Sequence, residues 1–328
     1  MKKNLIYLLA LIILGFLVWH FTNDGAKIKE SRIDRRDFSV ENIDEVDKII
    51  ITSKSPSTVS LDKQKDGTWL VNGEHLARQS NIDLMLKTMA RMEIKNPISK
   101  LMETQVIKRM TTESSKVEVY KDGTLDKVFY VGHNTPDNLG TYMLLKGGVK
   151  PYSIHLPGHT GYISSRFYTN AYLWRDRLVF DIDNLNIESI GMNYGQGDKL
   201  GFTITKVGGQ YQMKNHLNEE MTFNPIKVHE YLASFRNIKH EGFILKSDPI
   251  NGERLEKLLP YFDFTIKEKG KDELMLRAYY KMNNMLDEND NRFVEPDKDR
   301  MYARMNGDYF VIQYFNFKKM LKSSTDFK

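Results

Sequence analysis

The sequence predicts an α+β protein in which an N-terminal transmembrane helix precedes two tandem, similar modules, each with a mostly antiparallel sheet and two helices. Two observations lead to this prediction. A long apolar run lies near the N-terminus, and the order of strand, turn and helix signals then occurs twice. Trp69 and Tyr211 lie 142 residues apart, and Asn81 and Asn224 lie 143 apart. Such a constant offset is typical of a repeated structural unit.

The apolar run from Leu5 to Phe21 is interrupted only by His20, and Lys2 and Lys3 precede it. At about 1.5 Å per residue it is just long enough for a membrane helix. A cleaved signal peptide is the alternative, but bulky residues occupy 16–21, where small residues would precede a cleavage site. We therefore expect residues 1–22 to form a cytoplasmic N-terminus and a retained transmembrane anchor.

The sequence around the anchor favours a cytoplasmic N-terminus. Five basic residues between positions 27 and 36 oppose the simplest positive-inside pattern. However, Asn23 and Asp24 follow the helix directly, and long downstream domains translocate largely regardless of charge. The predicted location is the inner membrane, crossed once by residues 5–21, with the C-terminal body in the periplasm.

Composition limits the possible partners of the body. The net charge is only +5 over 328 residues, and acidic and basic residues alternate along the chain. This pattern lacks the basic patch of a nucleic-acid-binding protein, so we predict no nucleic-acid partner. The chain has no cysteine, which excludes disulfides, thiolate metal sites and a lipid-modified cysteine.

Residues 23–45 are polar and are expected to form a stalk before the first module, at 46–157. Turns at Asp66-Gly67 and Asn72-Gly73 indicate hairpins. Asn81 is the expected cap of a helix with a methionine-rich core face, and a second helix is expected over 100–110. The expected strands are 47–52, 58–63, 69–71, 116–120, 127–131, 141–145 and 152–155.

The second module, 187–328, repeats this order. Asn224 is the expected cap of its first helix, with Pro225 at the first helical position, and 254–259 is the expected core of its second helix. A polar insertion at 283–299 replaces a short turn. The expected strands are 189–194, 201–206, 210–213, 273–282, 301–305 and 309–314.

Residues 158–186 between the modules form an aromatic connector with interspersed arginines. Its aromatic side chains could simply be buried between the modules, or they could form a partner-binding surface. The candidate binding residues are Tyr142, Tyr152, Arg166, Tyr168, Tyr172, Trp174 and Arg175.

Three histidines, His133, His155 and His159, are the best metal-ligand candidates. Pro157 and Gly158 separate the last two, so a helix cannot bring them to one face as in a zinc-binding H-E-x-x-H motif. Histidines at strand ends are more often structural, so we predict no metal and no cofactor. The chain also lacks a Walker A motif, a nucleophile elbow and a dinucleotide fingerprint. We predict no catalytic residues and no enzymatic activity.

Several segments together resemble a known family. They are V-D-K-I-I-I from Val46, S-L-D-K-Q-K-D-G-T-W-L-V-N-G from Ser60, Y-V-G-H-N-T from Tyr130 and Y-L-W-R-D-R from Tyr172. Over most of residues 40–200 the chain resembles the bacterial domain-of-unknown-function family numbered 4340, in its Bacteroidota form. The resemblance implies a membrane-anchored, extracytoplasmic protein, some relatives of which accompany ABC-type transporter components linked to gliding motility. It implies no catalytic residue.

Two functions are consistent with these observations. The first is a non-enzymatic, membrane-anchored scaffold or accessory protein of the bacterial envelope that binds another envelope protein, near an ABC-type transporter or a gliding or secretion assembly. The alternative is a binding protein for a small molecule or envelope polymer, held in a cleft between the two modules.

Overall fold

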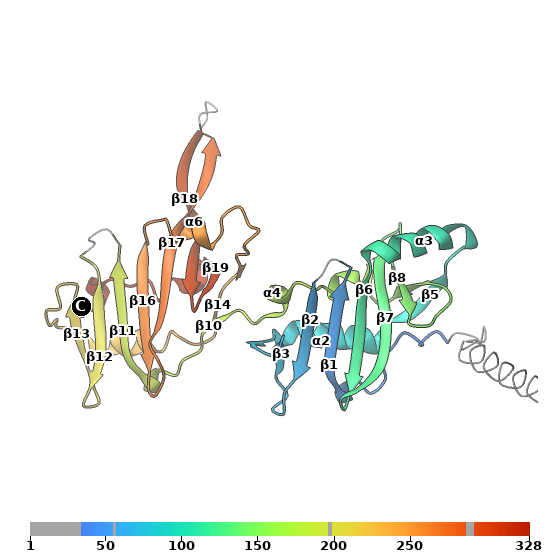
Figure 1. The fold of residues 1–328 in the computed structure, drawn as a ribbon. Helices are drawn as coiled ribbons and strands as arrows, with labels where there is room; N and C mark the ends of the chain where they lie inside the picture. Colours follow the sequence, from blue (N-terminus) through green and yellow to red (C-terminus); the bar gives the residue numbers. More distant parts are fainter. Residues whose placement is uncertain (1–33, 55–56, 196–198, 287–291) are drawn as a thin grey trace, which may run out of the picture. The chain divides into compact units, whose positions relative to one another are not determined.

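A computed structural model of the chain describes residues 34–54, 57–195, 199–286 and 292–328. The protein has the predicted α+β class with antiparallel sheets, and it divides into two compact units, one ending at Asp176 and the other beginning at Arg177 (Figure 1). Across these described ranges, no helix is both long enough and apolar enough to cross a membrane. The predicted anchor at 5–21 lies outside them.

Unit 1 is built on a nine-stranded antiparallel sheet with the order β4-β3-β2-β1-β6-β7-β8-β9-β5. Its strands are β1 (Val46–Ser53), β2 (Thr58–Lys63), β3 (Trp69–Val71), β4 (His75–Leu76), β5 (Glu93–Pro97), β6 (Ser115–Lys121), β7 (Thr124–Asn134), β8 (Thr141–Leu145) and β9 (Tyr152–His155). Its helices are η1 (Ile43–Glu45), α2 (Gln79–Arg91), α3 (Lys100–Glu113), η2 (Ser164–Arg166) and α4 (Ala171–Trp174).

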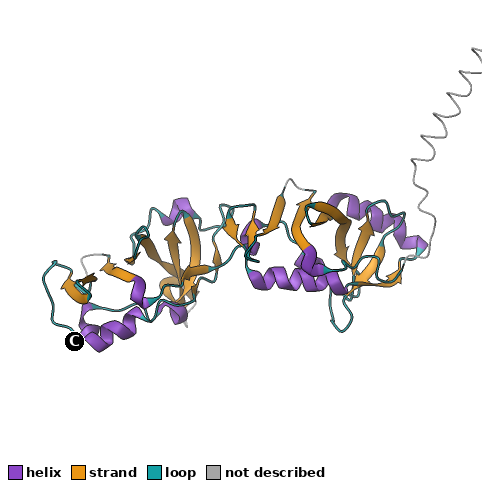
Figure 2. Cartoon of the chain, turned by 90° about the horizontal axis from the view of Figure 1, so that it is seen from below, coloured by secondary structure: helices purple, strands orange, loops and turns teal. Residues whose placement is uncertain are grey.

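The two long helices of unit 1 cover opposite faces of the sheet (Figure 2). Helix α2 buries Ile82, Met85 and Met89 in the main core, which confirms the predicted methionine-rich core face. Helix α3 packs Val106 and Met110 against the other face.

The predicted cap of α2 is wrong. Arg78 is the N-cap residue, and Asn81 lies inside the first turn. The Asn81 amide instead donates to the Tyr168 hydroxyl at 2.7 Å and to the Leu173 carbonyl at 3.0 Å. Tertiary partners therefore determine the role of Asn81. The corresponding prediction for Asn224 is confirmed, because its side chain accepts from the backbone N–H of Ile226 at 2.9 Å.

Unit 2 contains an eight-stranded antiparallel sheet with the order β13-β12-β11-β16-β17-β18-β19-β15. Its strands are β11 (Ile187–Tyr194), β12 (Phe202–Val207), β13 (Gln210–Asn215), β15 (Gly242–Phe243), β16 (Phe262–Glu268), β17 (Leu274–Leu286), β18 (Arg292–Met305) and β19 (Asp308–Gln313). A separate pair, β10 (Leu178–Phe180) and β14 (Ile238–Lys239), and the helices η3 (Asn184–Asn186), α5 (Pro225–Leu232), α6 (Gly252–Leu255), α7 (Tyr314–Phe317) and η4 (Ser324–Phe327) complete it.

The two strand orders correspond position by position once the edge strand β4 is set aside. Buried side chains follow the same register across the four equivalent strands. One such row consists of Val71, Leu61, Ile49 and Val119 in unit 1, and of Met213, Ile204, Ile190 and Ile266 in unit 2. Each sheet therefore presents the same apolar pattern to its helix.

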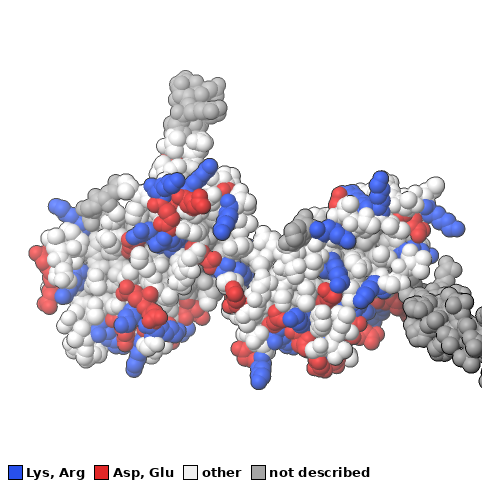
Figure 3. All heavy atoms as spheres, in the orientation of Figure 1, with Lys and Arg blue, Asp and Glu red and all other residues white. Residues whose placement is uncertain are grey.

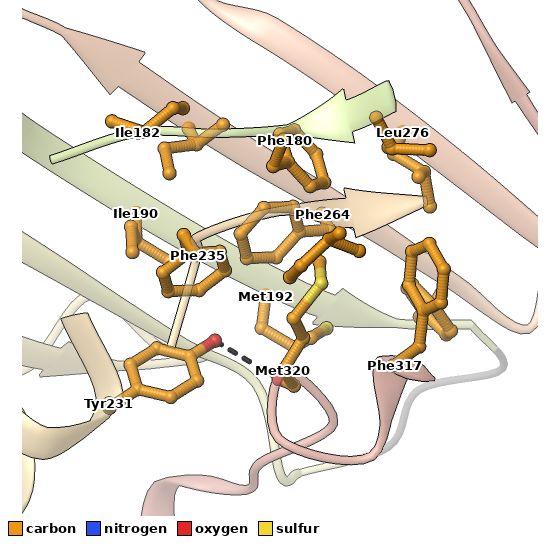
Figure 4. Packing of buried hydrophobic residues seen from close by; sticks show 14 of the residues in the cluster. Phe180, Ile182, Ile190, Met192, Tyr231, Phe235, Phe264, Leu276, Phe317 and Met320 are labelled. Atoms are coloured by element: carbon orange, nitrogen blue, oxygen red, sulfur yellow. Dashed lines mark hydrogen bonds between the residues drawn. The ribbon is translucent and has the colours of Figure 1, made fainter. Parts of the chain in front are cut away.

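The core of unit 2 is rich in phenylalanine (Figure 4). Phe235 stacks on Phe264 with ring centroids 5.4 Å apart, and Phe180 meets Phe264 edge-on at 5.5 Å. Phe180 and Ile182 lie in the predicted connector at 158–186, but they are buried in this core. The connector is thus divided, with residues up to 176 in unit 1 and the rest in unit 2.

A short segment enters the core of unit 1 in the same way. This N-terminal strap, residues 37–40, belongs to the predicted stalk at 23–45, yet Phe38 is fully buried and Val40 nearly so. The Val40 N–H donates to the Met89 carbonyl at 2.8 Å, and the Lys127 ammonium donates to the Asp37 and Ser39 carbonyls. The C-terminal end of the expected stalk is therefore part of the folded unit.

Two further predictions for unit 2 are corrected. The helix expected over 254–259 is the single turn α6, because Asn251 caps it and the helix ends at Leu255. Strand β16 was not predicted, although Phe262, Phe264 and Ile266 alternate along it and all face the core.

Candidate functional site

The predicted binding residues all lie in unit 1, but they do not converge on one site. Tyr152 pairs in register with Met143, whereas Tyr142 pairs with Ser153. Because adjacent strand residues point to opposite faces, Tyr142 and Tyr152 lie on opposite sides of the sheet. Tyr142 is buried beneath α3, and Tyr152 packs edge-on against Phe38 in the main core, with ring centroids 6.2 Å apart.

Tyr168 and Trp174 fasten the connecting segment to helix α2. Trp174 is buried, its Nε1–H donates to the Tyr168 carbonyl at 3.0 Å, and the two rings lie 4.4 Å apart. The Trp174 carbonyl accepts from the N–H of Arg78, the N-cap of α2, at 2.6 Å. These contacts give both aromatic residues a structural role.

Tyr172 is the aromatic residue of this set with the most exposed side chain, at 40%. The Arg175 guanidinium lies 5.1 Å from its ring centroid, a cation–π contact, and Arg175 itself is buried. Only a small aromatic surface therefore reaches solvent here.

Arg166 connects the segment to the middle of α2. It donates to the Thr88 hydroxyl at 2.6 Å and lies 3.3 Å from the His159 ring nitrogen Nε2. Burial lowers the pKa of this guanidinium. Because Thr88 is fully buried, this bond holds Arg166 against the helix, and Arg166 itself is only partly exposed.

The three candidate histidines occupy separate environments. His133 meets Tyr142 edge-on at 5.0 Å, and burial together with nearby Arg109 lowers its pKa. Burial together with Arg35 lowers the pKa of His155. Within the described residues, no group of three or more metal-ligating side chains comes together.

The most distinctive feature of unit 2 is a projecting β-hairpin (Figure 1). Strands β17 and β18 contain 13 and 14 residues, whereas their counterparts β7 and β8 contain 11 and 5. Pairing of β17 with β16 stops at Ala278, and pairing of β18 with β19 begins at Arg300. Beyond these points the described parts of β17 and β18 pair only with each other. We call residues 281–286 and 292–299 the arm.

A buried carboxylate organises the base of the arm. The β17–β18 ladder is interrupted between Tyr280 and Met282, and Asp297 lies opposite this break. The Asp297 carboxylate accepts from Lys281 at 2.5 Å and from the backbone N–H of Asp299 at 2.9 Å. Burial opposes its ionisation, but these hydrogen bonds outweigh that effect and lower the pKa to about 2.

One face of the arm exposes apolar side chains to solvent. Met282 pairs with Pro296 and Asn284 with Val294, so these four residues share one face. Met282 is 49% exposed and Val294 is 58% exposed. Figure 3 shows that the shaft of the arm is uncharged on the visible face, while charges of both signs are interspersed over the rest of that unit's surface. The sequence predicts a polar insertion at 283–299 in place of a short turn, whereas the described residues of this segment extend strands β17 and β18.

Comparison with known proteins identifies a family but no activity. A family described as "Domain of unknown function (DUF4340)" matches residues 69–257, more than half of the chain. The match begins at β3 in unit 1 and ends just after α6 in unit 2. No curated protein and no solved structure matches the chain. The chain belongs to the DUF4340 family of domains of unknown function.

Proposed function

We propose that this chain is a non-enzymatic scaffold or accessory protein of the bacterial envelope that binds another envelope protein through the arm of unit 2. In this proposal residues 5–21 anchor the chain in the inner membrane and both units lie in the periplasm. The partner belongs to an envelope assembly such as an ABC-type transporter or a gliding or secretion complex.

We further propose that the two units are copies of one duplicated module. The equal strand orders and the matched rows of buried residues support this. In that case each copy begins before the predicted module boundaries at residues 46 and 187. Phe38, Val40 and Asn42 lie 142 residues before Phe180, Ile182 and Asn184, the same offset that separates Trp69 from Tyr211.

The arm is the observation that favours protein binding. Within a duplicated module, features common to both copies are explained by folding, whereas the arm belongs to one copy. Its outer strand edges carry backbone groups without a ladder partner in the described residues, and such edges bind extended polypeptide segments by strand addition. Pro296 lacks an N–H, so the β17 edge is the better acceptor of a partner strand.

Site-specific photocrosslinking in cells tests this proposal. A crosslinker at position 282 or 294 should capture the same partner, because both side chains lie on one face of the arm. The control position is Leu101 on α3, which is 95% exposed. Met282→Asp should reduce capture from position 294 by about tenfold or more. The arm would not be the partner-binding surface if a partner were captured only from position 101. The same would follow if Met282→Asp left capture from position 294 unchanged.

The location has its own test, which uses the absence of cysteine. A single cysteine at Asn284 should react with a membrane-impermeant maleimide in cells whose outer membrane is permeabilised. A single cysteine at Asn4 should react only after the inner membrane is lysed. The opposite labelling pattern would refute the proposed topology.

A further inference from the structure

Unit 2 contains a groove that is independent of the arm. It has a volume of about 850 Å³ and lies between α5 and the C-terminal segment that includes α7 and η4. Its size falls in the range of small-molecule sites. The charged side chains that line it are Lys227, Glu230, Lys318, Lys319, Lys322 and Asp326.

The floor of the groove is rigid. Tyr231 and Phe327 are almost fully buried and pack edge-on with ring centroids 5.2 Å apart. The Tyr231 hydroxyl donates to the Met320 carbonyl at 3.0 Å, which links α5 to the C-terminal segment (Figure 4). Both walls are therefore held in place without a ligand.

The lysines of the groove are available to an anion. None of the four forms an ion pair with a side-chain carboxylate of the described residues. Lys227 donates at 2.6 Å to a main-chain carboxylate oxygen of Lys328, and Lys318 lies 5.0 Å above the Phe315 ring. An ammonium group has three donors, so these contacts leave capacity for a ligand.

The two acidic side chains offset part of this positive charge. Asp326 accepts from the backbone N–H of Ser323 at 2.7 Å and from its hydroxyl at 2.9 Å, and so serves to cap η4. Glu230 is exposed on α5. Four lysines against these two side chains and the Lys328 carboxylate leave an excess of one positive charge.

We propose that this groove binds a ligand carrying two or more phosphate groups. Lysines on both walls suit a ligand with separated anionic groups, because Lys227 lies on α5 and the other three lie on the C-terminal segment. Lysine binds phosphate as a compact point charge, and the lining supplies its positive charge through lysines alone. The proposal does not depend on the protein-binding role of the arm.

Unit 1 does not reproduce this arrangement. By the offset of 143 residues that separates Asn81 from Asn224, the groove residues Lys227 and Tyr231 correspond to Leu84 and Thr88. Thr88 is buried beneath Arg166, which donates to its hydroxyl. The groove is thus a property of one unit and is not required by the shared fold.

The test uses the full-length chain in a non-ionic detergent with tripolyphosphate as the probe. Binding is measured by calorimetry, and contact is measured as protection of each lysine from acylation, read by mass spectrometry. The four groove lysines should be protected. Lys319→Gln combined with Lys322→Gln should weaken binding about tenfold. Lys257→Gln combined with Lys269→Gln is the control, because it removes the same charge from unit 2 outside the groove.

A second probe separates two sources of phosphate. Mixed micelles containing cardiolipin, whose headgroup carries two phosphates, are compared with micelles containing phosphatidylcholine. Groove-lysine protection by cardiolipin alone supports a phosphate-binding groove that takes a lipid headgroup, and protection by tripolyphosphate supports a soluble ligand. Absence of protection by either probe, or equal weakening in the groove and control variants, would overturn the proposal.

Discussion

Asn81 and Asn224 show how one residue type serves two physical purposes in similar sequence contexts. Asn224 accepts a hydrogen bond from the first turn of its helix, as an N-cap does. Asn81 uses the opposite capacity of its amide, because its nitrogen donates to the Tyr168 hydroxyl and the Leu173 carbonyl. The two residues should therefore respond differently to loss of the amide nitrogen.

Asparagine-to-aspartate variants measure this difference. Aspartate is an equally good cap, so Asn224→Asp should change the stability of unit 2 by less than about 0.5 kcal/mol. Asn81→Asp turns a donor into a second acceptor facing a carbonyl oxygen and should destabilise unit 1 by about 1–3 kcal/mol. Urea unfolding of both variants gives the comparison. Equal effects would mean that Asn81 acts as a cap.

Asp297 should make the arm sensitive to acid. Its pKa in the folded protein, about 2, lies below the ordinary value of 3.8. The ionised carboxylate therefore stabilises the arm base fully above pH 3.8, and this contribution is lost as the pH falls toward 2. Hydrogen exchange of the arm amides, corrected for intrinsic rates, should accelerate over that interval. Asp297→Asn should show fast exchange already at neutral pH, whereas the exposed neighbour variant Asp299→Asn should not.

At the scale of elements, the short segments that precede β1 in unit 1 and β11 in unit 2 contribute buried side chains to the core of each unit. Phe38 and Phe180 are both almost completely buried, and each lies a few residues ahead of a central strand. Truncating a buried phenylalanine to alanine removes apolar contact and leaves a cavity. Each segment should therefore support only the unit into which it is inserted.

Intrinsic fluorescence can test this selectively, because the tryptophans of the chain are Trp19, Trp69 and Trp174, and none lies in unit 2. Phe38→Ala should lower the unfolding free energy reported by tryptophan fluorescence by about 3–5 kcal/mol. Phe180→Ala should leave the tryptophan transition unchanged. It should instead destabilise the second transition seen by circular dichroism, which reports the unfolding of unit 2. A tryptophan transition that shifts in both variants would contradict independent roles.

The sequence contains most of the strand pattern but not the features that distinguish the units. The pattern of apolar and polar residues was sufficient to predict strands β2, β8 and β9, whose predicted bounds match the structure. A similar pattern is present in strand β16, which was not predicted. The arm could not be recognised in the same way. Its base depends on an ion pair between the partly buried Lys281, in the expected strand 273–282, and the buried Asp297, in the expected polar insertion 283–299.

The candidate site illustrates a second limit. The sequence shows that the connector is rich in aromatic residues, but the spacing of these residues does not reveal which of them are engaged in contacts with α2. Trp174 and Tyr168 are, whereas Tyr172 remains partly exposed. The lysine groove combines α5 with a segment nearly 100 residues away, so it becomes visible only when the chain is folded.

At the scale of the whole molecule, the boundary between Asp176 and Arg177 separates two complete hydrophobic cores. A unit with its own core is expected to fold without its neighbour. Residues 34–176 and 177–328, produced separately, should each unfold cooperatively in urea with a midpoint close to that seen in the full chain. Absence of a cooperative transition in either fragment would place the boundary elsewhere.

The N-terminal strap determines how unit 1 would respond to mechanical force. A pull applied at residue 34 first loads the contacts of Arg35 with the edge strand β5, where the Ile94 N–H donates to its carbonyl and Glu93 pairs with its guanidinium. It then loads the Val40 bond to Met89 and the Lys127 bonds to Asp37 and Ser39. Their rupture would expose Phe38 and Val40 while β1 is still paired with β2 and β6. Tension on the N-terminal end would thus uncover a short apolar peptide well before the unit unravels.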